Sequence, residues 1–271
     1  MKILFCGDIV GKSGRDVVLK YVPRLRESFK LDFVIINGEN AAHGFGVTRK
    51  ICEELYAAGV DIVTTGNHVW DQKETVSHIS EDPRLIRPLN FPKNTPGKGF
   101  TIIENPQGKK LMVVNVMGQL FMDSLDNPFH AMEDLLHTYK MGQNVHGILV
   151  DIHAEANSEK MAMGHFLDGK ATLVAGTHTH VPTADYRILP KGTAYITDVG
   201  MTGNYQSVIG MDIEIALERF YKKTRSEKLF PPEGEGTLCG VIVDSDDTTG
   251  LAKTITPIRL GGILQQTEIL W

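Results

Sequence analysis

Two histidines with a single residue between them follow the apolar run 171–175, in the sequence Thr177-His178-Thr179-His180. On a β-strand, residues two apart point to the same side, so both imidazoles are expected to leave one face at the end of a strand. Imidazole is a common protein ligand for zinc, iron and manganese ions. The pair therefore indicates metal chemistry, provided that other parts of the chain supply further ligands.

Further oxygen and nitrogen donors come directly after other predicted strands, and glycine precedes three of them. Glycine allows the backbone to turn sharply at these points. Each donor alone is also typical of an ordinary turn, but the carboxyl ends of parallel strands meet at one edge of a sheet. We therefore expect the donors to converge. In chain order they are Asp8, Glu39, Asn40, Asn67, His68 and His153, followed by His178 and His180.

The donor set is too large for a single catalytic zinc ion, which takes three protein ligands and a water. Two metal ions with Glu39 as a bridge fit it better. Hard oxygen and imidazole donors without a thiolate favour iron, manganese or zinc. The predicted ligands are Asp8, Glu39, Asn40 and His180 for one ion, and Glu39, Asn67, His153 and His178 for the other.

Short apolar runs and amphipathic segments alternate between these donors. The first part of the chain reads as β-α-β-α-β, which predicts parallel pairing. Ser13 is the expected N-cap of the first helix, with Asp16 three residues later. The predicted strands are 3–6, 33–36, 60–64, 111–116, 148–152 and 173–175, with closing antiparallel strands at 240–243 and 253–258. The first predicted helix starts at Ser13. The other predicted helices span 48–59, 70–77, 131–139 and 213–221. Strands from two sheet regions with helices outside predict a layered α/β sandwich.

Composition narrows the class of protein. The 271 residues hold no Pro/Gly/Ser-rich linker, so we expect a single domain over 1–271. The net charge of −5, with both signs mixed, argues against binding of long nucleic acids. The three cysteines lie far apart, which argues against disulfides and thiolate zinc sites and favours a reducing cytoplasm. We expect no signal peptide and no membrane span.

Several motifs resemble those of the calcineurin-like metallophosphoesterase superfamily: Gly7-Asp8, Gly66-Asn67-His68, a later isolated histidine and the final His-x-His, in this order. The sequence departs from the common superfamily pattern at two places. Val10 replaces the histidine of the common Asp-x-His motif, and Gly38-Glu39-Asn40 replaces Gly-Asp-x-x-Asp. With the segments 65–71 and 197–203, this pattern resembles the narrower bacterial YmdB-like family over nearly the whole chain.

The resemblance implies an α-β-β-α sandwich and a dinuclear phosphodiesterase that acts on 2′,3′-cyclic and 3′,5′-cyclic AMP. It also implies iron or manganese as the metal and a homo-oligomeric assembly. The bridging acid would then be Glu39, and Asn40 would take the place of the missing histidine ligand.

The expected chemistry is attack of a metal-bound hydroxide on a phosphodiester, because paired ions lower the pKa of a bound water and neutralise phosphoryl oxygens. His68, directly after Asn67, is the predicted general acid for the leaving oxygen. It could instead be an exposed histidine at the start of a helix. Phe45 either stacks on a base or packs as a lid, and substrate-binding residues stay unassigned.

Two alternatives remain open. The segment Gly7 to Ser13 is similar to a nucleoside triphosphate-binding loop, but Cys6 stands where that motif needs its first glycine. A non-catalytic, metal-binding regulator that senses a nucleotide would keep the ligands without needing His68. The scarcity of basic residues near the ligands, apart from Lys12 and Arg15, favours a singly charged small-molecule diester.

Overall fold

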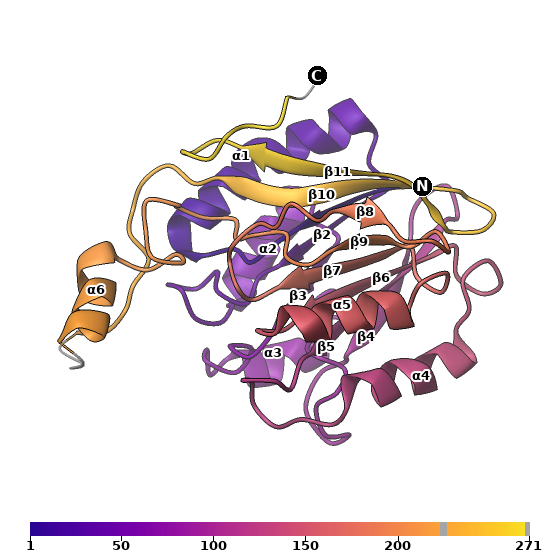
Figure 1. Cartoon of the computed structure of the whole chain (residues 1–271), viewed down its shortest axis with the longest axis horizontal. Coiled ribbons are helices and arrows are strands. Elements are labelled where there is room, and N and C mark those ends of the chain that lie inside the picture. The colour runs from indigo at the N-terminus through magenta and orange to yellow at the C-terminus, as the bar shows by residue number, and fades with distance from the viewer. Residues whose placement is uncertain (223–226, 269–271) are drawn as a thin grey trace.

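Two mixed β-sheets packed face to face, with helices on both outer faces, form the body of the molecule (Figure 1). The structure is a computed structural model and describes residues 1–222 and 227–268. The α-β-β-α sandwich predicted from the sequence is therefore confirmed.

The first sheet has the strand order β11-β10-β1-β2-β3. Strands β1, β2 and β3 run parallel, whereas β10 and β11 are antiparallel, as the sequence predicts. Its strands are β1 (Lys2–Cys6), β2 (Phe33–Asn37), β3 (Ile62–Thr64), β10 (Leu238–Ser245) and β11 (Ala252–Leu260).

The second sheet has the order β4-β5-β6-β7-β9-β8, with β5, β6, β7 and β9 parallel. Sequence patterns predicted three of its strands; the others are short or half-buried. Its strands are β4 (Phe100–Glu104), β5 (Lys110–Met117), β6 (Gly147–His153), β7 (Leu173–Thr177), β8 (Arg187–Ile188) and β9 (Ala194–Ile196).

The helices of the two outer layers connect the parallel strands. Helices α1, α2 and α3 pack on the first sheet, and α4 and α5 pack on the second. Helix α6 projects away from the body (Figure 1). The helices are α1 (Gly11–Phe29), α2 (Arg49–Ala57), α3 (Thr75–Glu81), α4 (Pro128–Thr138), α5 (Asn157–Phe166) and α6 (Ile213–Tyr221).

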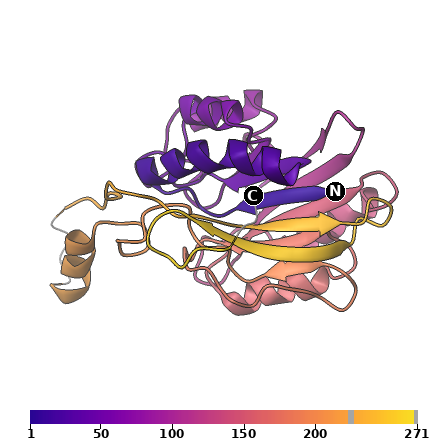
Figure 2. The same cartoon turned by 90° about the horizontal axis from the view of Figure 1, so that it is seen from above.

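Alternation of side chains along β1 divides the apolar core into layers. Ile3 and Phe5 face the second sheet and pack with residues of both sheets, whereas Leu4 and Cys6 face the helices. All four are fully buried, which is why this strand reads as one continuous apolar run. Figure 2 shows the sheets and helices that enclose this core from above.

Three predicted helix starts are wrong, and one of them, 131, lies three residues after the observed start of α4 at Pro128. Helix α1 begins at Gly11, and Ser13 lies inside it and donates to the Pro232 carbonyl instead of capping the helix. Backbone carbonyls replace the cap, because Gly11 N donates to Asn40 O at 3.0 Å. The helix predicted for 70–77 begins only at Thr75, since the preceding residues form turns.

No helix in the described part of the chain is both long and apolar enough to cross a lipid bilayer.

Candidate metal centre

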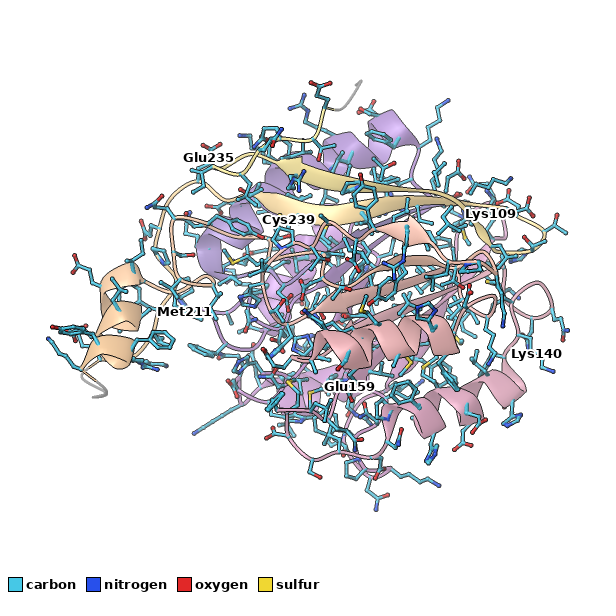
Figure 3. The ribbon with its side chains drawn as sticks, viewed as in Figure 1. Lys109, Lys140, Glu159, Met211, Glu235 and Cys239 are labelled. Carbon is cyan, nitrogen blue, oxygen red and sulfur yellow. The ribbon has the colours of Figure 1, made fainter. Side chains whose placement is uncertain are left out.

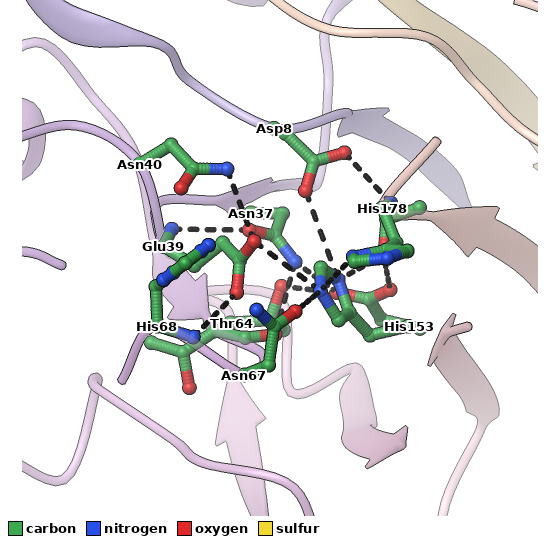
Figure 4. Close-up of polar contacts among 12 residues, drawn as sticks. Asp8, Asn37, Glu39, Asn40, Thr64, Asn67, His68, His153 and His178 are labelled. Atoms are coloured by element: carbon green, nitrogen blue, oxygen red, sulfur yellow. Dashed lines mark hydrogen bonds and ion pairs between the residues drawn. The ribbon is translucent and has the colours of Figure 1, made fainter. Parts of the chain in front are cut away.

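The loops after β1, β2, β3 and β7 meet the end of β6, and together they carry the donors predicted from the sequence (Figure 4). The first sheet supplies carboxylate and amide groups, and the second supplies imidazoles. The structure brings together Asp8, Glu39, Asn40, Asn67, His153, His178 and His180, which touch one another in an unbroken series of contacts.

One half of the cluster surrounds Nε2 of His153. This nitrogen lies 2.9 Å from Asn67 Oδ1, 3.2 Å from Glu39 Oε1 and 3.1 Å from His178 Nδ1. A ring nitrogen carries at most one proton, so His153 Nε2 cannot satisfy all three of these neighbours. Adjacent ligands of an octahedral ion with bonds of about 2.1 Å are about 3.0 Å apart. The spacing fits a divalent metal ion.

The other half of the cluster contains Asn40, whose side-chain amide lies 3.0 Å from Glu39 Oε1 and 3.2 Å from Nε2 of His180. His180 donates its Nδ1 proton to Ile209 O at 2.7 Å, which leaves Nε2 as the free lone pair. Rotation of the Asn40 amide by half a turn would present its oxygen at the same place.

Asp8 lies against His178 and His153, with its Oδ1 3.7 Å from His153 Nδ1. It is fully buried, and its Oδ2 accepts a hydrogen bond from the backbone N of His178 at 3.1 Å. No hydrogen-bond partner for its Oδ1 lies among the described residues. A buried, unpaired carboxylate oxygen is costly, and coordination of a cation would satisfy it.

His178 and His180 converge on the cluster for a reason other than the predicted one. Strand β7 ends at Thr177, and the two histidines have left-handed backbone conformations, with φ of 93° and 66°. Such conformations are strained for residues with a side chain. Asp198 holds the loop by accepting from Thr179 N at 3.2 Å and Thr179 Oγ1 at 2.7 Å.

Asp198 is itself neutralised by Lys160 of α5, whose Nζ lies 2.7 Å away, and both side chains are fully buried. Sequence reasoning left the 198–203 loop without a role and did not single out Lys160. No signal in the local pattern marked this lysine, because a single cation in an amphipathic helix normally faces solvent.

A second supporting network lies beneath His153. Thr177 Oγ1 contacts His153 Nδ1 at 2.9 Å and donates to Asp151 Oδ1 at 2.6 Å. Asp151 also accepts from Thr64 Oγ1 and Asn37 Nδ2. Partners of this kind orient metal-binding histidines. Sequence reasoning missed this network, although an acidic residue inside the apolar strand β6 was a signal for it.

Gly66 is needed for space rather than for a turn. Gly7, Gly38 and Gly66, which precede donors, do not adopt left-handed φ values, so the predicted reason is wrong. A Cβ atom at Gly66 would lie 2.3 Å from both Glu39 Oε2 and His153 Nε2. Absence of a side chain at Gly66 therefore allows the two donors to approach the backbone.

The buried charges make the cluster attractive to cations. Burial raises the pKa of Asp8, although His180 and His153 oppose the shift. Burial also disfavours ionisation of Glu39, but His153 outweighs it and holds the Glu39 pKa below its usual value. Burial opposes a charge on His153, yet Glu39 and Asp8 raise its pKa to about 9. The shifts reflect burial of the carboxylates together with their interaction with imidazoles.

His68 lies at the edge of the cluster and is partly exposed. Its backbone N donates to Glu39 Oε2 at 3.1 Å, and its Nδ1 lies 2.8 Å from Asp71 Oδ2. The ring of Phe45 meets the His68 ring edge to face, with centroids 5.1 Å apart. Phe45 therefore packs beside the predicted general acid.

Several donors of the phosphate-binding loop considered from the sequence are already used within the protein. Gly11 N is already bonded to Asn40 O, and Val10 N to Thr202 O. Lys12 is exposed and pairs with Asp16 at 2.6 Å, and Arg15 donates to the Ala41 carbonyl. Both basic side chains are paired within the protein, which argues against a cradle for a triphosphate.

Comparison with known proteins agrees with this architecture. A solved structure from Thermus thermophilus, described as a hypothetical protein, is similar with a TM-score of 0.90 and 44% identity, covering 97% of this chain and all of that one. A structure described as a novel phosphatase from Mycoplasma pneumoniae gives a TM-score of 0.89 and 36% identity, covering 96% and 93% of the two chains. The fold is therefore of the metallophosphoesterase type.

Sequence comparison is more specific. The model of the YmdB-like protein family matches residues 4–258. A Bacillus subtilis protein named 2′,3′-cyclic-nucleotide 2′-phosphodiesterase is 51% identical over 96% of this chain and 97% of its own length. The chain belongs to the YmdB-like family, as its motifs indicated. Its fold implies divalent metal ions, and the spacing and donor types of the cluster fit them.

Proposed function

We propose that this protein is a dinuclear metal-dependent phosphodiesterase that hydrolyses 2′,3′-cyclic nucleotides, and 3′,5′-cyclic AMP as a second substrate. The observation that carries the proposal is the convergence of carboxylate, amide and imidazole donors from both sheets, with spacings of 2.9 to 3.2 Å around His153 Nε2. The substrate class comes from the relative at 51% identity. Because both sheets supply donors, we infer that residues 1–271 act as one domain.

The proposed ligands divide into two sets that share Glu39, and iron or manganese is the proposed metal. Two such ions lower the pKa of bound water and neutralise charge on phosphoryl oxygens. Asp8 and the His180 side chain are oriented for the first ion by the contacts described above. The Thr177 hydroxyl fixes His153 for the second. The first set is Asp8, Glu39, Asn40 and His180, and the second is Glu39, Asn67, His153 and His178.

His68 is the proposed proton donor. Asp71 holds its Nδ1, so that Nε2 is the nitrogen left for the leaving oxygen. In hydrolysis of a 2′,3′-cyclic phosphate, water adds to phosphorus and the bond from phosphorus to O2′ breaks. A proton supplied through His68 then converts O2′ to a hydroxyl, and the product is a 3′-phosphomonoester. A general acid of this kind contributes about 10² to 10⁴-fold.

The test is hydrolysis by protein reconstituted with Mn²⁺ or Fe²⁺ after treatment with a chelator. We expect 2′,3′-cyclic AMP to give the 3′-monophosphate and 3′,5′-cyclic AMP to be cleaved in parallel assays. His68→Ala should lower kcat and leave the metal content unchanged. His137→Ala, which alters an exposed histidine of α4, is the matched control.

Absence of hydrolysis by the loaded protein would refute the proposal and favour a non-catalytic regulator. One metal equivalent per chain instead of two would refute the dinuclear centre, even if hydrolysis were observed. Loss of metal together with activity in His68→Ala would show that this residue is not a proton donor but part of the metal site.

A further inference from the structure

A second cluster of potential ligands lies between helices α2 and α3, in the helical layer that covers the first sheet. Cys52, His78 and Asp82 each place one ligand atom within 4.8 Å of those of the other two. None of them takes part in the contacts of the metal centre described above. Cys52 is fully buried, and His78 is 4% exposed.

The spacing along the chain aligns these groups. His78 and Asp82 are four residues apart at the end of α3, and Cys52 and Tyr56 are four residues apart on α2. Residues with this spacing share one helix face. Two helix faces therefore meet with a thiol and a phenol on one side, and an imidazole and a carboxylate on the other.

His78 has donor and acceptor capacity that the protein does not use. Neither of its ring nitrogens has a hydrogen-bond partner within residues 1–222 and 227–268. Its Nε2 lies 3.4 Å from Asp82 Oδ2, outside hydrogen-bond geometry. An imidazole buried without hydrogen bonds is costly, and a ligand between His78 and Asp82 would remove that cost.

Asp82, in contrast, is already held in place. Its Oδ2 accepts from the Tyr56 hydroxyl at 2.7 Å, and its Oδ1 accepts from Arg84 N at 2.9 Å. Such hydrogen bonds orient a carboxylate for metal binding without occupying all of its lone pairs.

We propose that Cys52, His78 and Asp82 form a second metal site that binds Zn²⁺, separate from the centre that carries the phosphodiesterase chemistry. A thiolate, an imidazole and a carboxylate are typical zinc ligands. The charges balance, because Cys52 as thiolate and Asp82 as carboxylate neutralise a divalent ion in a buried place. The wide spacing of the cysteines argued against a thiolate zinc site. That prediction concerned sites built from several cysteines, whereas this site combines one cysteine with a histidine and an aspartate.

The site would connect two segments that border the metal centre. Helix α2 follows the loop of Phe45, and α3 follows the turns that hold His68. Gln72 Nε2 donates to Phe45 O at 2.7 Å, and Thr75 Oγ1 donates to Val47 O at 2.8 Å. A zinc ion held by Cys52 in the first half of α2, and by His78 and Asp82 towards the end of α3, would tie these segments together.

The test uses Co²⁺ as the probe, added to the full-length protein after treatment with a chelator. A cysteine thiolate bound to Co²⁺ gives a charge-transfer absorption in the near ultraviolet, whereas the oxygen and imidazole donors of the other centre do not. We expect this band in the unsubstituted protein and its loss on addition of Zn²⁺. We also expect its loss in Cys52→Ser and Cys52→Ala, and its retention in Cys239→Ser.

Absence of the band in the unsubstituted protein with excess Co²⁺ overturns the proposal, as does its persistence in Cys52→Ala. Circular dichroism establishes that each variant is folded. If the Cys52 variants do not fold, His78→Gln decides the matter. It retains the thiol and must still lose the band at the Co²⁺ concentration that saturates the unsubstituted protein.

Discussion

Substitution of Gly66 by alanine tests whether the close approach at this residue sets the geometry of the metal centre. The added Cβ would lie 2.3 Å from Glu39 Oε2 and His153 Nε2, whereas ordinary van der Waals contact begins at 3.4 Å. The donors and the backbone must therefore separate by about 1.1 Å, the difference between these two distances. A displacement of about 1 Å at a reacting centre costs about 10²-fold in rate.

We expect Gly66→Ala to lower kcat by about that factor and to weaken binding of the metal held near His153. Overpacking also destabilises the fold by about 1 to 3 kcal/mol. Gly164→Ala separates the two effects, because its Cβ would lie 2.5 Å from the ring of Tyr195 and touch no proposed ligand. Metal content by elemental analysis, kcat, and thermal unfolding are measured for both variants.

Only Gly66→Ala is expected to lose metal, whereas both variants are expected to lose stability. Wild-type metal affinity and turnover in a folded Gly66→Ala protein would refute the proposed coordination. Metal binding would then tolerate a displacement of its ligands that the proposed coordination does not allow.

Three other perturbations have defined outcomes. Thr177→Val removes the hydroxyl that orients His153, so metal affinity measured by competition with a chelator should fall about 10- to 100-fold. Lys160→Met leaves the buried Asp198 carboxylate unpaired, so denaturant titration should show a loss of about 3 to 5 kcal/mol, and Lys160→Met combined with Asp198→Asn should recover part of it. Burial disfavours ionisation of Asp185, but its hydrogen bonds outweigh burial and lower its pKa. The difference in unfolding free energy between the unsubstituted protein and Asp185→Asn is therefore fully present above the ordinary aspartate pKa. It is lost as pH falls through the lowered pKa of Asp185. Urea titrations of both proteins from neutral to acid pH measure this difference.

The sequence was most informative where strand order and motif position agree. The β-α-β-α-β pattern alone placed Asp8, Glu39 and Asn67 at one sheet edge, because parallel strands end on the same side. Strands such as β4 and β9 were missed, because β4 is only half-buried and β9 is three residues long. Their assignment depends on neighbouring strands rather than on local pattern.

The supporting residues were harder to predict than the ligands. His178 and His180 converge through left-handed backbone, which is uncommon for residues other than glycine. That conformation depends on Asp198 and Lys160, which are far along the chain from each other. Interactions of this kind arise from tertiary packing, so spacing within a segment carries little information about them.

The position of β1 in the first sheet affects when the centre can be assembled. In the sheet, β1 lies between β2, the next strand in the sequence, and β10, which is near the opposite end of the chain. Lys2 of β1 pairs with Asp244 of β10. Figure 3 labels Cys239, which also lies on β10. Contacts of such long range form slowly, and they cannot form while the later residue is still being synthesised. The loop of Asp8 reaches its final support only after β10 has left the ribosome. Assembly of the proposed metal centre is consequently a step that follows translation of nearly the whole chain.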